Sequence, residues 1–346
     1  MINSICFLTT YRCNAKCDYC ECGPKAETGL TLAEMVRLID EAAELGTVNL
    51  VVFSGGEPSL LRDDLFAAIG HATSRGMLTR VVTNGMWGIT PKKAEEFVDR
   101  LLEAGLSEIN ISVDDLHQRW IPLERPRNAF LACYKRGVKC LLAHKQNKSS
   151  MITVPYLREF FGVDLIDYEH GREYTEEEQC RLISSGSIIP VGRNEDQADL
   201  SDHIYGSWRH SCGSVLRDII VGARGNFLPC CGIVTKNTPE LTREDLRTTS
   251  LIDAIDNANR DVMLNWIALE GPAAIAEFVK EKDPSVQFAD EYVGICHICN
   301  EVLTRPDVRR VIAEHLPEIT ERVSTHRAFF EGIRGDEELV ASYLRP

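Results

Sequence analysis

Short apolar runs alternate with amphipathic segments over the first half of the chain. Runs rich in Val, Ile, Leu and Phe predict strands near residues 5–10, 50–53, 78–83, 108–112, 138–143 and 188–191. Between them, apolar residues at helical spacing predict helices near 31–46, 63–75, 91–104, 123–135 and 155–161. Thr31 and Glu34 have the capping-box spacing at the start of the first helix. This alternation predicts an α/β fold built from parallel β/α units.

The regular alternation ends near Arg193. A polar, acidic stretch from Asn194 to Asp202 indicates a linker, and the segment from Pro306 to Leu344 has the charged, helical pattern of a solvated outer layer. We therefore expect three parts. They are a barrel domain over residues 1–200, a smaller domain over 201–305 and a helical extension over 306–346.

Composition limits the classes of partner. The chain has 346 residues and a formal net charge of −14, which argues against a nucleic-acid ligand because phosphates require a basic face. No apolar run reaches the ~20 residues that a membrane span needs. The chain has 13 cysteines, yet Met1–Ser4 lead straight into a predicted strand without a signal-peptide pattern. We expect a cytoplasmic protein with reduced cysteines.

Three cysteines follow the first predicted strand, at positions 13, 17 and 20, with Tyr19 before the last. Three thiolates this close can hold three irons of a cubane cluster and leave the fourth iron open to an external ligand. A zinc knuckle is the alternative, but structural zinc takes four protein ligands, and Cys22 completes no such pattern. The sequence Ser54-Gly55-Gly56-Glu57-Pro58 comes next, where the second strand should end.

These motifs, in this order, resemble the radical SAM superfamily. The resemblance implies a partial (β/α)6 TIM-like barrel and a 4Fe-4S cluster on Cys13, Cys17 and Cys20. It also implies S-adenosylmethionine (SAM) on the open iron, as the source of a 5'-deoxyadenosyl radical. Parallel barrels carry their chemistry at the carboxyl ends of strands, where these motifs fall.

The same resemblance assigns residues to SAM. The turn of Gly55, Gly56 and Glu57 would bind its amino group, Tyr19 would lie against the adenine, and Arg193 would pair with the carboxylate. Ribose and methionine contacts would come from other strand ends, at Asn84, Ser112 and Asp114. Each of these polar residues taken alone also suits a helix N-cap. His117 and Trp120, just past the fourth strand, are candidates to touch substrate.

A second set of cysteines lies beyond residue 200. Cys212 is followed by twelve residues, Gly225, four residues and Cys230, and much later Cys296 and Cys299 form a CxxC. This layout resembles the twitch or SPASM-like domain of radical SAM enzymes and implies one auxiliary 4Fe-4S cluster on these four cysteines. Four cysteines also suit zinc. Cys231 is left without an assigned partner, so it is either a hydrogen-atom donor to a substrate radical or a small buried hydrophobe.

The leading hypothesis is a radical SAM enzyme that epimerises a residue of a ribosomally made peptide, with Cys231 as donor, because radical SAM peptide epimerases resemble this chain in layout. The lack of a leader-recognition domain before Ile5 counts against a peptide substrate. One alternative is a small-molecule enzyme, either a twitch-type dehydrogenase or a sugar or aminoglycoside epimerase, and another is a peptide-crosslinking maturase. All need an electron donor such as flavodoxin or ferredoxin.

Overall fold

The computed structural model describes residues 2–18, 20, 28–190, 200–230, 238, 241 and 244–335. Within them, the strands are β1 (Ser4–Leu8), β2 (Leu50–Ser54), β3 (Leu78–Thr83), β4 (Glu108–Ser112), β5 (Lys139–Gln146), β6 (Ile166–Asp167), β7 (Leu182–Ser187), β8 (Asp218–Val221) and β9 (Phe227–Leu228).

The helices of the barrel half are α1 (Leu32–Glu44), α2 (Asp63–Ser74), α3 (Pro91–Glu103), α4 (Asp115–Gln118), α5 (Glu124–Lys135), α6 (Val154–Phe161) and α7 (Glu176–Gln179), with a 3₁₀ turn, η1, at Pro58–Leu61. After a second 3₁₀ turn, η3 (Leu200–Asp202), come α8 (Leu251–Asn259), α9 (Val262–Leu269), α10 (Pro272–Lys282), α11 (Ile295–Thr304), α12 (Pro306–Glu314) and α13 (Leu316–Gly335).

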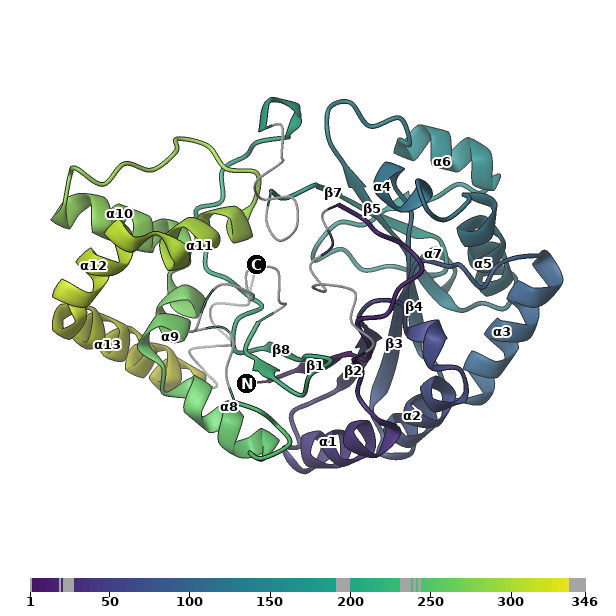
Figure 1. Ribbon diagram of the computed structural model, residues 1–346, viewed down its shortest axis with the longest axis horizontal. Coiled ribbons are helices and arrows are strands. Elements are labelled where there is room, and N and C mark those ends of the chain that lie inside the picture. Colours follow the sequence, from purple (N-terminus) through teal and green to yellow (C-terminus); the bar gives the residue numbers. More distant parts are fainter. Residues whose placement is uncertain are drawn as a thin grey trace.

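The described strands form one sheet in the order β6-β7-β5-β4-β3-β2-β1-β8-β9. Every pairing from β6 to β8 is parallel, and only β9 runs antiparallel, against β8. Figure 1 shows the sheet curving with α2, α3, α5 and α6 outside it, while α8–α13 gather on the opposite side. The structure confirms the predicted α/β class with a parallel sheet.

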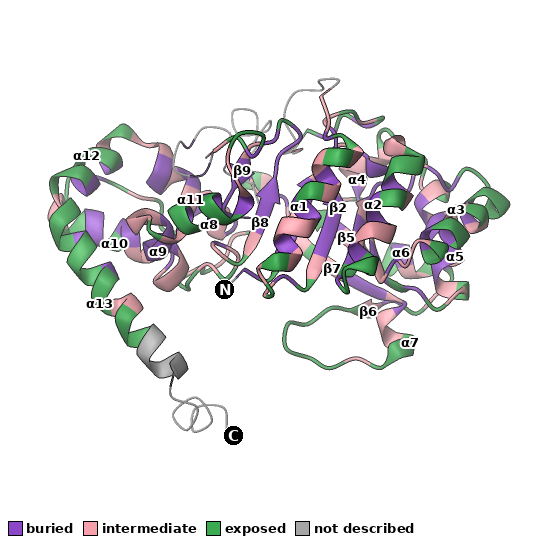
Figure 2. Ribbon diagram, turned by 90° about the horizontal axis from the view of Figure 1, so that it is seen from below, coloured by how far each residue is buried: buried purple, intermediate pink, exposed green. Residues whose placement is uncertain are grey.

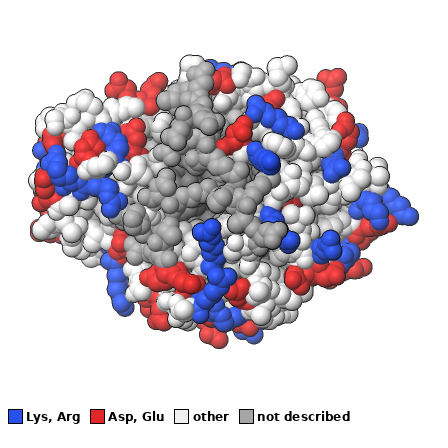
Figure 3. Space-filling model, in the orientation of Figure 1, with Lys and Arg blue, Asp and Glu red and all other residues white. Residues whose placement is uncertain are grey.

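The amphipathic pattern of the sequence accounts for how the helices cover the sheet. In α1, Thr31 and Glu34 form the capping box that the sequence predicts, and Met35, Leu38 and Ile39 turn inward. The central strands are buried between the helices, whose outer faces are exposed (Figure 2). On the face shown in Figure 3, acidic and basic side chains of the described residues are interspersed.

The sixth long strand was predicted in the wrong place. The apolar run 188–191 predicts a strand, but β7 runs over Leu182–Ser187 and pairs with β5 from Leu141 to Gln146. Ser184, Ser185 and Ser187 weaken the apolar pattern of β7. They are tolerated because β7 lies near the end of the sheet, with only the two-residue β6 beyond it.

Within the described residues, the C-terminal extension from Pro306 consists of two helices, because Pro317 has no N–H to continue a helix through His315 and Leu316. Both helices bury apolar residues, at Val308, Val311, Ile312, Ile319 and Val323.

The polar contacts of α13 tie it to α9. Arg322 on α13 donates to the Glu270 carboxylate at the end of α9, at 2.6 Å. The extension is therefore packed against the helices before it.

The sheet continues across residue 200, the boundary predicted between two domains, because β8 pairs with β1.

Among the described helices, none by itself has the length and apolar character of a membrane span. One sharply bent pair, α9 with α10, meets that test by length and composition.

Candidate active site

The loop that carries Cys13, Cys17 and Cys20, here called the cysteine loop, is joined at its start to the turn after β2. Gly56 N donates to the Thr10 carbonyl oxygen at 2.6 Å, and Glu57 N donates to that of Arg12 at 2.9 Å. A Cβ atom on Gly56 would lie closer than 3.0 Å to the Arg12 oxygen, so a larger residue would displace backbone. Glycine at this position therefore lets the turn lie directly against the cysteine loop.

Glu57 connects this turn to the end of β3. Its carboxylate is 0% exposed and accepts hydrogen bonds from Thr83 Oγ1 at 2.7 Å, Asn84 N at 2.8 Å and Ser59 N at 3.1 Å. Burial raises the pKa of the Glu57 carboxyl, against these hydrogen bonds, which lower it. In this structure the carboxylate joins two strand ends.

Asn84 reaches from the end of β3 to the cysteine loop. Its Nδ2 donates to Asn14 Oδ1 at 3.0 Å and lies 3.8 Å from Cys13 Sγ. Its Oδ1 accepts from Met86 N at 3.0 Å, which fixes the orientation of the amide. Two of the residues predicted to contact SAM, Glu57 and Asn84, therefore support the cysteine loop as well.

The three thiols share one apolar cluster with Ala15, Met86 and Ile121. Burial raises the pKa of the Cys13 thiol to about 11. The hydrogen bond from Ala15 N lowers this pKa, whereas Glu57 and the other two thiols raise it further. A bound cationic cluster reverses that balance, because a coordinating thiol is deprotonated.

Among the described residues, no three His, Cys, Asp or Glu side chains converge to hold a single metal ion. A cubane requires no such convergence, because each thiolate binds a different iron. The donor set and its apolar surroundings fit a 4Fe-4S cluster held by three cysteines.

The short helix α4 brings an acid–histidine pair to this loop. Asp114 is 1% exposed, caps α4 by accepting from Leu116 N and His117 N, and accepts from His117 Nδ1 at 2.9 Å. The His117 side chain is 16% exposed. Burial lowers the pKa of His117, but Asp114 and then Cys17 outweigh it and raise the pKa to about 10.

Two further contacts hold the cysteine loop against the same segment. Arg119 Nη1 donates to Asp18 Oδ2 at 2.7 Å, and Lys16 Nζ lies 5.9 Å from the ring centre of Trp120, a cation–π contact. Trp120 is exposed and lies near Lys16. Contact of His117 and Trp120 with substrate stays a prediction.

Of the predicted SAM contacts Ser112, Tyr19 and Arg193, only Ser112 lies within the described residues. Ser112 is the half-buried last residue of β4 and pairs with Ala143 of β5. Tyr19, Arg193 and the proposed hydrogen-atom donor Cys231 lie outside the described residues, as does Cys22. Their roles stay predictions.

The second set of cysteines is distributed over neighbouring elements of the C-terminal half. Cys212 N donates to Ile267 O of α9 at 3.1 Å, and Cys230 is buried two residues after β9. Cys296 and Cys299 are both on α11, three positions apart, so they lie on one side of that helix. Their shared ligation of a cluster stays a prediction.

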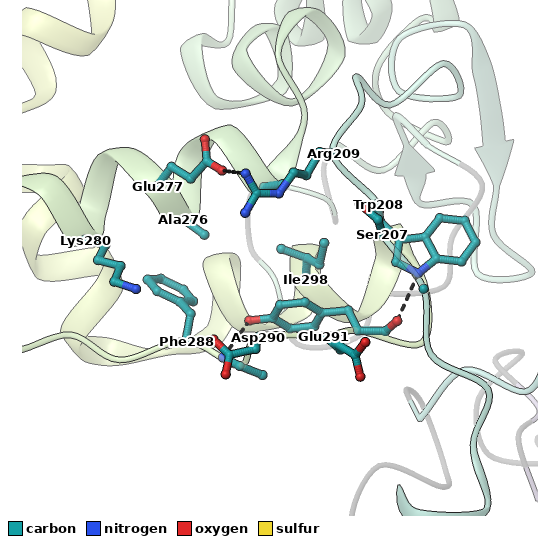
Figure 4. Close-up of a pocket in the computed structure, with 14 residues that line it drawn as sticks. Ser207, Trp208, Arg209, Ala276, Glu277, Lys280, Phe288, Asp290, Glu291 and Ile298 are labelled. Atoms are coloured by element: carbon teal, nitrogen blue, oxygen red, sulfur yellow. Dashed lines mark hydrogen bonds and ion pairs between the residues drawn. The ribbon is translucent and has the colours of Figure 1, made fainter.

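A cavity of about 330 Å³ opens in this half between α10, α11 and the segment around Trp208 (Figure 4). Apolar side chains form its floor, including Ile298 and Phe288, and Arg209 at the rim pairs with Glu277 at 2.8 Å. Trp208 Nε1 donates to the Tyr292 carbonyl oxygen at 3.0 Å. The cavity shares no lining residue with the cysteine loop.

Comparison with known proteins agrees with this geometry. The PqqA peptide cyclase of Xanthomonas campestris is 29% identical over 285 residues, which is 72% of each chain. The putative peptide biosynthesis protein YydG of Bacillus subtilis is 22% identical, over 84% of this chain and 89% of that protein. Among the curated relatives compared, the matched share of the relative's length runs from 28% to 89%.

The fold is also that of solved enzymes. The structure of anSMEcpe with bound AdoMet and the Kp18Cys peptide superposes with a TM-score of 0.51 at 12% identity, over 94% of this chain and 100% of that one. Residues 7–159 match the radical SAM superfamily, and they contain the cysteine loop, the glycine turn and α4. These residues therefore form a radical SAM domain.

Proposed function

We propose that this enzyme modifies a ribosomally made peptide. The observation that carries the proposal is the relationship to PqqA peptide cyclase, which extends over 72% of both chains and so beyond the radical SAM domain. The fold shared with peptide-bound anSMEcpe supports the same substrate class.

The residues of the site have distinct tasks in this proposal. Cys13, Cys17 and Cys20 hold the cluster, and the turn of Gly55, Gly56 and Glu57 fixes their loop against the sheet. When bound, the cluster and SAM supply a 5'-deoxyadenosyl radical that removes a hydrogen atom from the peptide. Apolar packing around the thiols would limit the access of water to the cluster.

Epimerisation is the reaction we propose first. Cys231, next to the buried Cys230, would return a hydrogen atom from its thiol to the peptide carbon radical, on the face opposite to the one attacked. We also propose that Cys212, Cys230, Cys296 and Cys299 hold the auxiliary 4Fe-4S cluster. A flavodoxin or ferredoxin would deliver the electron that reduces the SAM-binding cluster. The comparison with a peptide cyclase favours crosslinking as the second candidate.

One experiment separates these reactions. The reduced enzyme is incubated with SAM and candidate precursor peptides in deuterated water, and each product is weighed by mass spectrometry. Epimerisation adds about one mass unit, because a thiol hydrogen exchanges with solvent before it is transferred. Crosslinking or dehydrogenation instead removes two hydrogens. Loss of two hydrogens from the peptide would refute epimerisation, and absence of any peptide product would refute the substrate class.

Variants test the assigned donor. Cys231→Ala should still make 5'-deoxyadenosine but accumulate little epimer, and Cys231→Ser should do no better because an O–H bond is stronger than an S–H bond. Cys180→Ala is the matched control. Cys180 is buried, its thiol donates to Glu176 O of α7, and it has no place in the proposal. Normal epimerisation by Cys231→Ala would contradict the assignment.

A further inference from the structure

The cavity between α10 and α11 is a hollow with a largely apolar floor. Its volume is about 330 Å³, and it is lined by Ala276 of α10, Ile298 of α11 and Phe288 (Figure 4). Ala276 and Ile298 are buried, and the single methyl group of Ala276 leaves the space beside it open. Ligand pockets begin at about 300 Å³, so a hollow of this size suits one large side chain better than a large ligand.

The wall that carries Phe288 and Tyr292 is held in place by several contacts. Tyr292 is buried, its hydroxyl donates to Glu301 Oε2 at 2.9 Å, and its carbonyl oxygen accepts from Trp208 Nε1 at 3.0 Å. The guanidinium of Arg305 lies 5.0 Å from the ring centre of Phe288. Because the wall is already ordered, a ligand that enters the cavity loses little free energy in ordering it.

The rim of the cavity is polar and has an excess of acidic groups. It carries the carboxylates of Glu277, Asp290 and Glu291 and the cations of Arg209 and Lys280. Among the described residues, the one ion pair at this rim joins Arg209 to Glu277, at 2.8 Å. Asp290 and Glu291 are consecutive and exposed, so they can pair with a cationic group of a ligand. The formal net charge of −14 also favours a basic partner.

Residues 200–209 connect this cavity to the carboxyl edge of the barrel. In the loop after β5, Lys148 N donates to the Asp202 carbonyl oxygen and Ser149 N donates to Asp202 Oδ1, both at 2.9 Å. Trp208, at the cavity, follows Asp202 by six positions. Six residues of extended chain span at most about 22 Å. A peptide segment of similar length therefore covers the distance from the cavity to this edge.

We propose that the cavity binds an apolar side chain of the precursor peptide, next to a lysine or arginine that pairs with Asp290 and Glu291. The inference rests on the proposed peptide substrate and gives that peptide a second binding site. The apolar side chain supplies affinity by leaving water, and the basic neighbour fixes the direction in which the peptide lies. Since the cavity shares no lining residue with the cysteine loop, the anchored residue is not the modified one.

The first experiment measures peptide binding to the reconstituted full-length enzyme. Random peptides displayed on phage are selected on the enzyme, and the enriched peptides are synthesised with a fluorescent label. They should contain a large apolar residue beside lysine or arginine. Ala276→Phe fills the space for the apolar side chain and should weaken their binding, measured by fluorescence anisotropy, about tenfold or more. Joint Asp290→Lys and Glu291→Lys should weaken it about threefold, and this loss should shrink as salt is added.

Two variants on α10 are matched controls. Ala274→Phe makes the same chemical change as Ala276→Phe at a half-buried position that does not line the cavity. Glu281→Lys reverses an exposed charge that does not line the cavity either. Both should bind the selected peptides as the wild type does. Melting temperature and iron content are measured for every variant, and if Ala276→Phe does not fold, the charge reversal at the exposed positions 290 and 291 decides.

Three results would overturn the inference while leaving the peptide substrate in place. They are selection that enriches no basic and apolar peptide, selected peptides that bind the folded cavity variants as tightly as the wild type, and an unchanged KM of these variants for a peptide that the wild type modifies. The cavity would then have another occupant, whether a small molecule or a second copy of the chain.

Kinetics with a modified peptide separate this inference from the proposed function. Ala276→Phe should raise KM for that peptide about tenfold, with the loss in KM rather than in kcat, because the anchor lies away from the reacting carbon. Absence of any modified peptide would refute the proposed function, and the binding of the selected peptides would then decide for or against the cavity.

Discussion

Replacing Gly56 by alanine tests whether the glycine turn and the cysteine loop act as one unit. The new Cβ would lie closer than 3.0 Å to the Arg12 carbonyl oxygen, a backbone atom that cannot rotate away. The hydrogen bonds from Gly56 N and Glu57 N hold the two segments at this distance, so relief of the clash must break them. Overpacking typically costs about 1–3 kcal/mol, and because the new Cβ collides with fixed backbone we expect a cost of about 3 kcal/mol for this variant.

The size of the chain converts this cost into a change of melting temperature. An unfolding entropy of about 2.1 cal/mol/K per residue over 346 residues makes each kcal/mol equal to about 1.4 °C. Gly56→Ala should therefore melt about 4 °C lower than the wild type. It should also lose iron from the SAM-binding cluster, because the displaced segment leads directly into Cys13.

Gly70→Ala is the control for the same chemical change. Gly70 lies in α2, and an added Cβ would come no closer than 3.9 Å to its nearest neighbour, Ala104 O. Alanine in a helix interior is more favourable than glycine by about 0.5–1 kcal/mol, so this variant should melt slightly higher and keep its iron. Thermal denaturation and iron analysis of both proteins provide the comparison. Wild-type melting and full iron in Gly56→Ala would refute the reasoning.

Three further predictions follow from the site and its surroundings. Alanine at any one of Cys13, Cys17 and Cys20 should abolish SAM cleavage, and wild-type formation of 5'-deoxyadenosine by any of these variants, measured by chromatography, would contradict the assigned ligands. Joint replacement of the second set of cysteines, Cys212, Cys230, Cys296 and Cys299, should remove about half of the iron found by elemental analysis. Zinc in the purified wild-type protein would refute an auxiliary iron–sulfur cluster on these cysteines. Burial raises the pKa of the Glu270 carboxyl, but hydrogen bonds from Arg322, Trp266 and His326 outweigh it and keep the pKa below its ordinary value. The stability that Glu270 contributes is thus present above the ordinary glutamate pKa and is lost as the pH falls through the lowered pKa. Glu270→Gln should therefore flatten the acid side of a curve of melting temperature against pH. An unchanged slope would show that the contact between α9 and α13 contributes nothing to stability.

Local signals predicted most of the barrel. The first five long strands follow from apolar runs, and the start of α1 follows from Thr31 and Glu34, because strand burial and helix capping depend on neighbouring residues. The placement of β7 could not be predicted in this way. Its serines are tolerated by its position in the sheet, and that position depends on pairing with β5, about 40 residues earlier in the chain.

In the site, too, the sequence predicts where residues lie along the chain but not which distant residues they contact. Sequence position places Glu57, Asn84 and Asp114 at the carboxyl ends of strands, and the structure confirms that position for all three. Position alone does not distinguish a residue that contacts SAM from one that supports the cluster loop, because both kinds occur at strand ends. Only the structure shows the partners of these residues: Glu57 has three donors from its own chain, and Asp114 accepts from His117. Contact of either residue with SAM stays a prediction.

The influence of Cys17 on His117, whose pKa it raises, spans 100 positions of the sequence and has no local signature except the spacing of Asp114 and His117 on a short helix. Aspartate followed three residues later by histidine also suits an ordinary N-capped turn, so the spacing by itself predicts a cap. The parallel topology of the sheet allows a second interpretation of the Asp114–His117 spacing. Because β1 and β4 are parallel members of one sheet, the segments that leave their carboxyl ends emerge on the same side, and a histidine after β4 can reach a cysteine after β1. In a parallel barrel, then, polar pairs just beyond a strand end should be examined for contacts with every other strand-end loop before they are assigned to a cofactor or to a cap.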